Sequence, residues 1–153
     1  MRTPIKIDMS TDDIITPGEI SHKFELMFEK RTISLLAYNI ETVLAEKLET
    51  IISRGLANTR MRDFYDIYIL QEYQPSGFDT DVFAKAVENT CKTRASWRLM
   101  LDGKSRIADF TKSDVMRELW NNYQRKFDYA QEISWAEVVG AAEKLLYKTG
   151  LID

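Results

Sequence analysis

The amino-acid sequence predicts an α+β fold in which a short β segment precedes a mainly helical domain. Before residue 39, short runs of β-forming residues alternate with turn residues, whereas apolar residues recur at helical spacing from Asn39 onward. The 153 residues are 44% hydrophobic and 29% charged, which is typical of a soluble globular protein with one core. We therefore assign residues 1–38 to the β segment and residues 39–153 to the helical domain.

Three strands are expected in the β segment. Ile5–Met9 is the first, and His22–Phe28 and Thr32–Tyr38 are two further runs that pair around residues 29–31. Thr16–Gly18 contains proline and glycine and provides a turn before these two runs. The expected product is a small antiparallel or mixed sheet.

The helical domain begins with two helices whose ends carry clear signals. Asn39 is favoured as an N-cap and Gly55 is favoured after a helix, so a helix is predicted over Ile40–Arg54. A second helix is predicted over Arg60–Tyr73, before the turn residues 74–77. Further helices are predicted from Asp79 or Thr80 to about Thr93, from Ser113 to about Phe127, and from Ser134 to about Lys148. The apolar faces of the last two contain Val115, Leu119 and Tyr123, and Val138, Ala142 and Leu145, while Ser96–Leu101 is ambiguous.

Charge and composition exclude several classes of function. The net charge of −3 argues against a generally basic protein that coats nucleic acid, so any nucleic-acid contact must be local. Cys91 is the only cysteine and His22 the only histidine, which excludes an internal disulfide, a cysteine-based zinc site and a histidine-rich metal site. Cys91 lies in a helical pattern and is expected to be a small buried residue. The sequence has no signal-peptide pattern and no membrane span, so we expect a cytoplasmic protein with no membrane partner.

One lysine and two aspartates lie where the first two helices are expected to bury apolar groups. At about 100° per residue, Lys47 falls within roughly 60° of the centre of the apolar stripe on the first helix, whereas Glu46 and Glu49 point away from it. Asp63 and Asp66 share one face of the second helix with two large aliphatic residues. Since an unpaired buried charge costs several kcal/mol, we predict that Lys47 lies against Asp63 or Asp66.

Arginines near this pair indicate an anion-binding site. Arg54, Arg60 and Arg62 are close in sequence, and Arg62 and Asp66 have the i,i+4 spacing of a helical ion pair. Aspartates that orient such cations create a site suited to phosphate. The alternative explanation is an ordinary interhelical salt bridge at the edge of the core.

Two other motifs have competing explanations. A group of aromatic residues lies near Arg125 and Lys126 and suggests a base-stacking surface, although its helical spacing favours core packing. Asp79-Thr80-Asp81 resembles a pair of metal-binding carboxylates, but its position after a turn favours helix capping. The aromatic residues are Trp120, Tyr123, Phe127, Tyr129 and Trp135.

Three segments together resemble a known family. Ile5–Ser10, Tyr38–Leu48 and Arg60–Tyr68 are similar to the AbiEii/AbiGii toxin family of nucleotidyltransferase-like proteins, most strongly between residues 38 and 70. The resemblance implies a small mixed sheet whose carboxylates hold a divalent metal, Mg²⁺, and a helical part that completes the nucleotide pocket. It also implies a toxin of a toxin–antitoxin or phage abortive-infection system, with an antitoxin as partner, a nucleoside triphosphate as substrate and tRNA or another RNA as acceptor.

The resemblance also implies roles for individual residues. Asp8 matches the strand-borne metal ligand, and Lys47 matches the lysine near the nucleotide phosphates. The sequence pattern described above adds Arg60 and Arg62 to this phosphate site. Asp63 and Asp66 match an acidic pair, one member of which is needed for activity; which of the two stays open. Magnesium held by carboxylates aligns the attacking hydroxyl with the triphosphate, and the lysine offsets charge on the leaving pyrophosphate.

One part of the family pattern is missing from the chain. The first motif of the family is a Gly-Ser pair followed by Asp-x-Asp, and this sequence contains no Gly-Ser dipeptide. We therefore expect a truncated or split nucleotidyltransferase-like toxin component that is not catalytically competent alone. An exposed sheet edge then predicts self-association or a need for an amino-terminal fragment. The alternative function is a non-enzymatic helical module that binds a partner protein or RNA.

Overall fold

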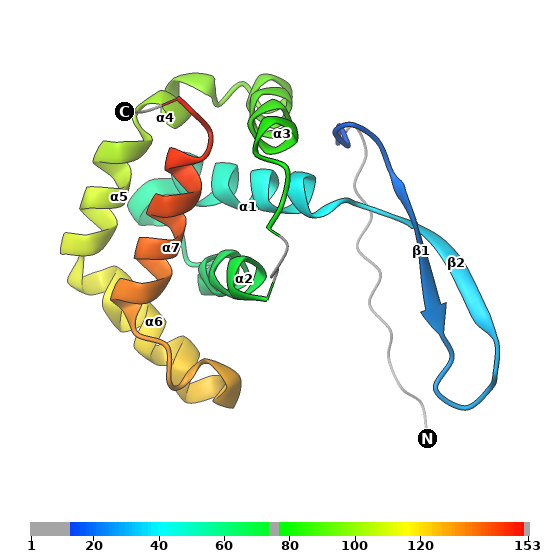
Figure 1. The fold of residues 1–153 in the computed structure, drawn as a ribbon. Helices are drawn as coiled ribbons and strands as arrows, with labels where there is room; N and C mark the ends of the chain where they lie inside the picture. The colour runs from blue at the N-terminus through cyan, green and yellow to red at the C-terminus, as the bar shows by residue number, and fades with distance from the viewer. Residues whose placement is uncertain (1–12, 74–76, 152–153) are drawn as a thin grey trace.

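The computed structural model describes residues 13–73 and 77–151, and in these residues a β-hairpin precedes a body of α-helices (Figure 1). The predicted α+β class is therefore confirmed. The hairpin pairs β1 (Ile20–Glu25) with β2 (Thr32–Ala37) in antiparallel register, with His22 opposite Leu35. The helices are α1 (Ile40–Arg54), α2 (Met61–Glu72), α3 (Thr80–Thr93), α4 (Trp97–Leu101), α5 (Gly103–Lys112), α6 (Asp114–Lys126) and α7 (Trp135–Tyr147), with short 3₁₀ turns at Gly55–Ala57 and Asp128–Ala130.

Capping residues set most of the helix ends as predicted. The Asn39 side chain accepts a hydrogen bond from Thr42 N, and α1 ends at Arg54, directly before Gly55. Asp79, Ser113 and Ser134 each cap the following helix, so capping accounts for Asp79. The predicted strand Ile5–Met9 lies outside the described residues.

Two features of the helical body differ from the sequence prediction. The ambiguous segment forms α4, and α5 was not predicted at all, because it begins at a glycine and buries only Gly103, Ile107 and Phe110. Val115 was also placed wrongly, since it is 68% exposed while Met116, the next residue, is fully buried. The start of α6 is rotated by one residue relative to the predicted face, because Met116 and Trp120 together fill the core.

The core of the described residues lies around α1 and α2. Phe64 of α2 contacts Phe110 of α5 and Trp135 of α7, with ring centroids 5.4 and 5.0 Å apart. Trp120 has no exposed surface, and its Nε1 donates a hydrogen bond to Ile133 O over 2.9 Å. Val138, Ala142 and Leu145 are buried as predicted. This packing holds α1 and α2 rigidly at the point where they carry Lys47 and the two aspartates.

A buried polar network joins the chain before the hairpin to the helices. Asn39 Nδ2 donates to Thr16 O over 2.6 Å, and Thr16 N donates to Thr42 Oγ1 over 3.0 Å. Asn89 Nδ2 of α3 donates to the Thr16 hydroxyl over 2.9 Å. The base of the hairpin is therefore attached to both α1 and α3.

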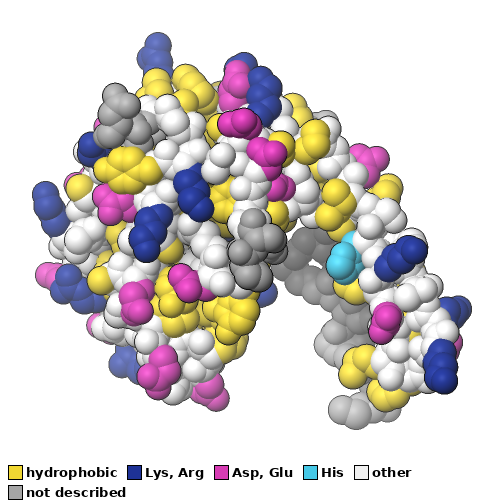
Figure 2. Space-filling model, viewed as in Figure 1, with side chains coloured by type: hydrophobic (Ala, Val, Ile, Leu, Met, Phe, Trp, Pro, Cys, Tyr) yellow, Lys and Arg dark blue, Asp and Glu magenta, His cyan; other side chains and the backbone are white. Residues whose placement is uncertain are grey.

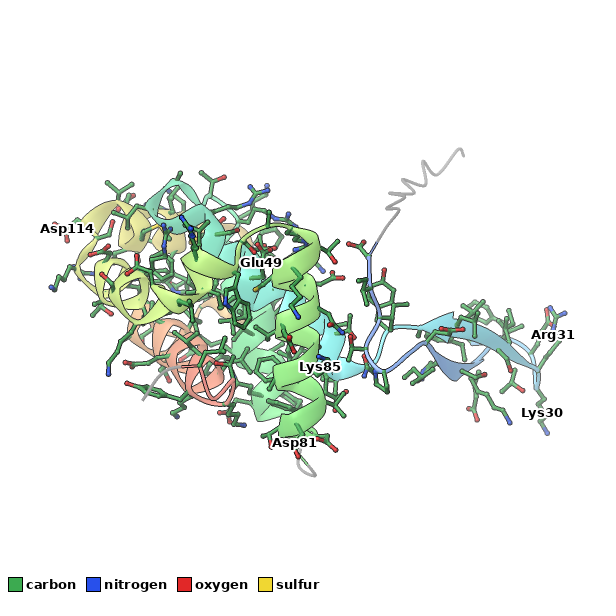
Figure 3. All side chains as sticks on the ribbon, turned by 90° about the horizontal axis from the view of Figure 1, so that it is seen from above. Lys30, Arg31, Glu49, Asp81, Lys85 and Asp114 are labelled. Carbon is green, nitrogen blue, oxygen red and sulfur yellow. The ribbon has the colours of Figure 1, made fainter. Side chains whose placement is uncertain are left out.

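The hairpin itself projects away from the helical body and carries apolar side chains on its surface (Figures 1 and 2). Met27 and Phe28 near its tip are 90% and 93% exposed. Figure 3 shows Lys30 and Arg31 at the end of the hairpin farthest from the helices. Among the described residues the sheet has only these two strands, so each strand has one edge without a partner strand. Other exposed apolar residues of the hairpin are Ile20, Phe24, Ile33, Leu35 and Leu36.

No helix within residues 13–73 and 77–151 is both long and apolar enough to cross a membrane.

Candidate functional site

Lys47 of α1 contacts both aspartates of α2. Its Nζ lies 2.6 Å from Asp66 Oδ2 and 3.4 Å from Asp63 Oδ1, so the predicted contact is confirmed for both carboxylates. The chain passes from α1 to α2 through the 3₁₀ turn at Gly55–Ala57, after which Asn58 Oδ1 accepts a hydrogen bond from Arg60 N over 2.9 Å. This short connection places the start of α2 against the middle of α1.

Two arginines surround the acidic pair on its outer side. Arg60 Nε lies 3.0 Å from Asp63 Oδ2, and Arg62 Nε lies 3.8 Å from Asp66 Oδ2. The Asp63 side chain is only 6% exposed, whereas the Arg60 and Arg62 side chains are 56% and 78% exposed. The Asp63 carboxylate therefore lies deep in the site, the Asp66 carboxylate is partly buried, and the guanidinium groups lie at the surface.

These five side chains line a single pocket together with Thr59, Met61 and Tyr123. Three cations against two carboxylates leave the pocket with a formal charge of +1. Buried carboxylates that hold exposed cations in place present those cations to solvent, which is the arrangement that binds phosphate groups. Arg54, the third arginine of the sequence pattern, does not line this pocket.

The site also contains an incompletely satisfied polar atom. Asp63 Oδ2 is buried and accepts no well-aligned hydrogen bond, although Arg60 Nε is 3.0 Å away. A buried carboxylate oxygen without a full hydrogen bond costs free energy. Arg60 therefore compensates the charge of Asp63 without completing a well-aligned hydrogen bond to this oxygen.

The described residues do not form a metal site by themselves. Nowhere in residues 13–73 and 77–151 do three His, Cys, Asp or Glu side chains come together in a way that suits a metal ion. Asp63 and Asp66 are both paired with Lys47. Asp8, which the family resemblance identifies as a metal ligand, lies outside the described residues.

A second ion-pair cluster lies between α1 and α3, and sequence reasoning missed it. Glu49, which the periodicity places off the apolar stripe of α1, is 3% exposed, and Figure 3 shows it within the helical body. Arg94 Nη1 lies 2.8 Å from Glu49 Oε2, and Arg94 Nη2 lies 3.5 Å from Asp13 and 3.8 Å from Glu46. Arg94 follows the end of α3, so no local pattern around Glu49 indicates this partner.

This cluster makes the stability of the protein depend on the ionisation of Glu46. Burial, and after it the nearby Asp13 carboxylate, raise the pKa of Glu46 above its usual value of 4.5. The folded state therefore holds the Glu46 proton more tightly than the unfolded state, and the stability due to this group is lost as pH rises above 4.5 through the raised pKa. We expect Glu46→Gln to raise the melting temperature at pH 7 but not below pH 4.5. Melting curves that show the same difference at both pH values would contradict this explanation.

Cys91 is buried, as predicted. Burial raises the pKa of its thiol to about 11, so the thiol is protonated at neutral pH and is a poor nucleophile. Cys91 is part of the core and not of the candidate site.

The fold and the site define a mainly helical α+β protein with a pocket of formal charge +1 between its first two helices. The sequence matches the family described as nucleotidyl transferase AbiEii toxin, type IV TA system, over residues 1–141. The chain therefore belongs to the AbiEii family, which gives it a nucleotidyltransferase-like role of the toxin–antitoxin type. No curated protein and no solved structure matches the chain.

Proposed function

We propose that Lys47, Asp63 and Asp66 form the phosphate-binding side of a nucleotidyl-transfer site. Lys47 and the exposed guanidinium groups of Arg60 and Arg62 bind the phosphates of a nucleoside triphosphate, while the aspartates hold these cations in position. The observation that carries the proposal is the layering of the pocket, in which the exposed guanidinium groups of Arg60 and Arg62 lie over the less exposed carboxylates that they pair with. Positioning and charge neutralisation are the main contributions that a protein makes to phosphoryl-type transfer.

In this proposal the remaining metal ligands come from a second polypeptide. The chain has no Gly-Ser dipeptide, and Asp79 caps α3 far along the chain from the lysine helix. In this proposal Asp8 and carboxylates from that polypeptide hold Mg²⁺, and the chain alone does not catalyse transfer to tRNA or another RNA. The β segment, residues 1–38, meets this polypeptide, a second copy or an antitoxin through the edges of β1 and β2 that have no partner strand among the described residues. The helical domain, residues 39–153, completes the pocket. We place the reaction in the cytoplasm, where RNA acceptors are abundant, and the abortive-infection role remains part of the proposal.

Replacing Lys47 tests the phosphate site without requiring catalysis. We expect Lys47→Met to weaken binding of inorganic tripolyphosphate at least tenfold, because the removed ammonium group is largely buried and within reach of the pocket. Isothermal titration calorimetry measures this change. Lys85→Met is the matched control, since Lys85 of α3 is exposed and pairs with Glu88 (Figure 3).

Two results would change the proposal. Equal affinity of the Lys47→Met and Lys85→Met variants for tripolyphosphate, combined with a loss of stability of about 1–3 kcal/mol for the former, would favour the non-enzymatic helical module. The specific observation behind that alternative is the 2.6 Å contact between Lys47 and Asp66, which also joins α1 to α2. Transfer of labelled nucleotide to tRNA by the purified chain with Mg²⁺, abolished by Asp8→Ala, would contradict its catalytic incompetence.

A further inference from the structure

A cluster of aromatic side chains adjoins the rim of the Lys47 pocket. Tyr123 of α6 lines the pocket, and its hydroxyl shares a hydrogen bond with the Tyr129 hydroxyl over 2.9 Å. The Tyr129 ring lies 4.7 Å from the Tyr65 ring and stacks on Phe127, with centroids 5.4 Å apart. Tyr65 precedes Asp66 on α2, so this cluster and the ion pairs share one corner of the molecule.

Core packing explains only part of the aromatic group. Trp120 and Trp135 are 0% and 7% exposed and belong to the core, as predicted. Tyr129 is 52% exposed, and Tyr65, Tyr123 and Phe127 are only half-buried. Tyr65 and Tyr123 also pack against the core, so the cluster is anchored on its inner side and exposed mainly at Tyr129. A partly exposed group of aromatic rings beside a pocket is an arrangement on which nucleobases stack.

The aromatic cluster and the cations are close enough to act on one ligand. Tyr123, Arg60 and Arg62 line the same pocket. The Arg62 side chain is 78% exposed at this rim. A nucleotide presents a flat base and an anionic phosphate a few ångströms apart, and the site offers a partner for each.

We propose that Tyr65, Tyr123, Phe127 and Tyr129 form a base-stacking shelf for a nucleotide whose phosphate is bound by Arg60 and Arg62. The inference rests on the proposed phosphate-binding role of the pocket and adds the surface that recognises the base. Two sources supply this chemistry, a free nucleoside triphosphate and the end of a single-stranded RNA. Stacking is tolerant of base identity, because every base has a π-face.

Variants of Tyr129 in the full chain test the shelf with three probes. The probes are inorganic tripolyphosphate and ATP, measured by calorimetry, and a labelled short single-stranded RNA with a 5′ hydroxyl, measured by fluorescence anisotropy. We expect Tyr129→Leu to weaken binding of ATP, of the RNA, or of both about tenfold and to leave tripolyphosphate unchanged. Tyr129→Phe retains the ring and should bind like the wild type. Tyr147→Leu is the matched control, because Tyr147 is 42% exposed on α7 and packs near Lys104 of α5.

The three probes distinguish a free nucleotide from the end of an RNA as the ligand of the shelf, and they distinguish base stacking from phosphate binding. A loss confined to ATP assigns the shelf to the free nucleotide, and a loss confined to the RNA assigns it to the acceptor. Arg62→Gln should in addition lower the slope of log affinity for RNA against log salt concentration by about 0.7, the value for one phosphate of a single strand. Melting curves verify that each variant is folded.

Several results would overturn the shelf. The first is that the wild type binds neither ATP nor the RNA. The second is that Tyr129→Leu and Tyr147→Leu bind ATP and the RNA with equal affinity. The third is that Tyr129→Leu loses as much affinity for tripolyphosphate as for ATP or the RNA. Failure of the phosphate-site proposal looks different. In that case Lys47→Met binds tripolyphosphate normally, while the loss of ATP or RNA binding in Tyr129→Leu persists.

Discussion

Replacing Arg94 with methionine should lower the free energy of unfolding by about 3 kcal/mol, because it leaves the Glu49 carboxylate buried without its partner. Glu49 is 3% exposed, and Arg94 Nη1 at 2.8 Å is the cation that compensates its charge. Breaking a buried pair costs about 3–5 kcal/mol, and the Arg94 side chain itself is 33% exposed, so the lower end of that range applies. Urea denaturation followed by circular dichroism measures the change.

A double variant shows whether the uncompensated charge is the cause. Glu49→Leu combined with Arg94→Met removes both charges and should recover most of the lost stability, because apolar side chains of similar volume replace a buried pair at little cost. Arg117→Met is the control, since Arg117 forms an exposed pair with Asp114, which Figure 3 labels on α6. The loss of this pair should cost less than about 1 kcal/mol. A double variant no more stable than the Arg94 variant would mean that Arg94 acts through packing.

Gly55→Ala should destabilise the protein by about 2–4 kcal/mol through backbone strain and the loss of a helix cap. Gly55 has φ 55° and ψ −140°, a combination that residues with a Cβ rarely adopt. A Cβ at this position would lie 2.8 Å from Arg106 Nη1, which donates a hydrogen bond to Ile52 O at the end of α1 over 3.0 Å. Thermal and urea unfolding both report this loss.

The chain contains a matched glycine control for this experiment. Gly140 lies within α7, and a Cβ added there would meet no atom within 4 Å. Gly140→Ala should therefore stabilise the protein by about 0.5–1 kcal/mol, because alanine favours the helix. If Gly55→Ala were as well tolerated as Gly140→Ala, the turn between α1 and α2 would not depend on glycine. Because that turn positions Arg60, the Gly55 variant should also bind tripolyphosphate more weakly.

Local signals in the sequence determined where α1 lies and what it carries. Asn39 and Gly55 predicted the ends of this helix correctly, since both act on backbone groups within a few residues. Periodicity alone predicted that Lys47 lies against an aspartate of the next helix, because a connection of few residues leaves a buried charge few possible partners. The same local signals placed the caps of α3, α6 and α7.

Only the tertiary structure decided which groups lie inside and which lie at the surface. Glu49 is buried because Arg94, 45 positions later, reaches it from the end of α3, and nothing near Glu49 in the chain encodes that contact. Tyr129 lies beside Tyr65 because the turn after α6 returns to α2. Tyr129 is therefore exposed, whereas the two tryptophans of the same aromatic group in the sequence are buried. Helix periodicity indicates which residues share a face, but the partner that covers the face depends on long-range packing. The layer of exposed arginines above the less exposed aspartates, which supports the proposed function, is a result of that packing.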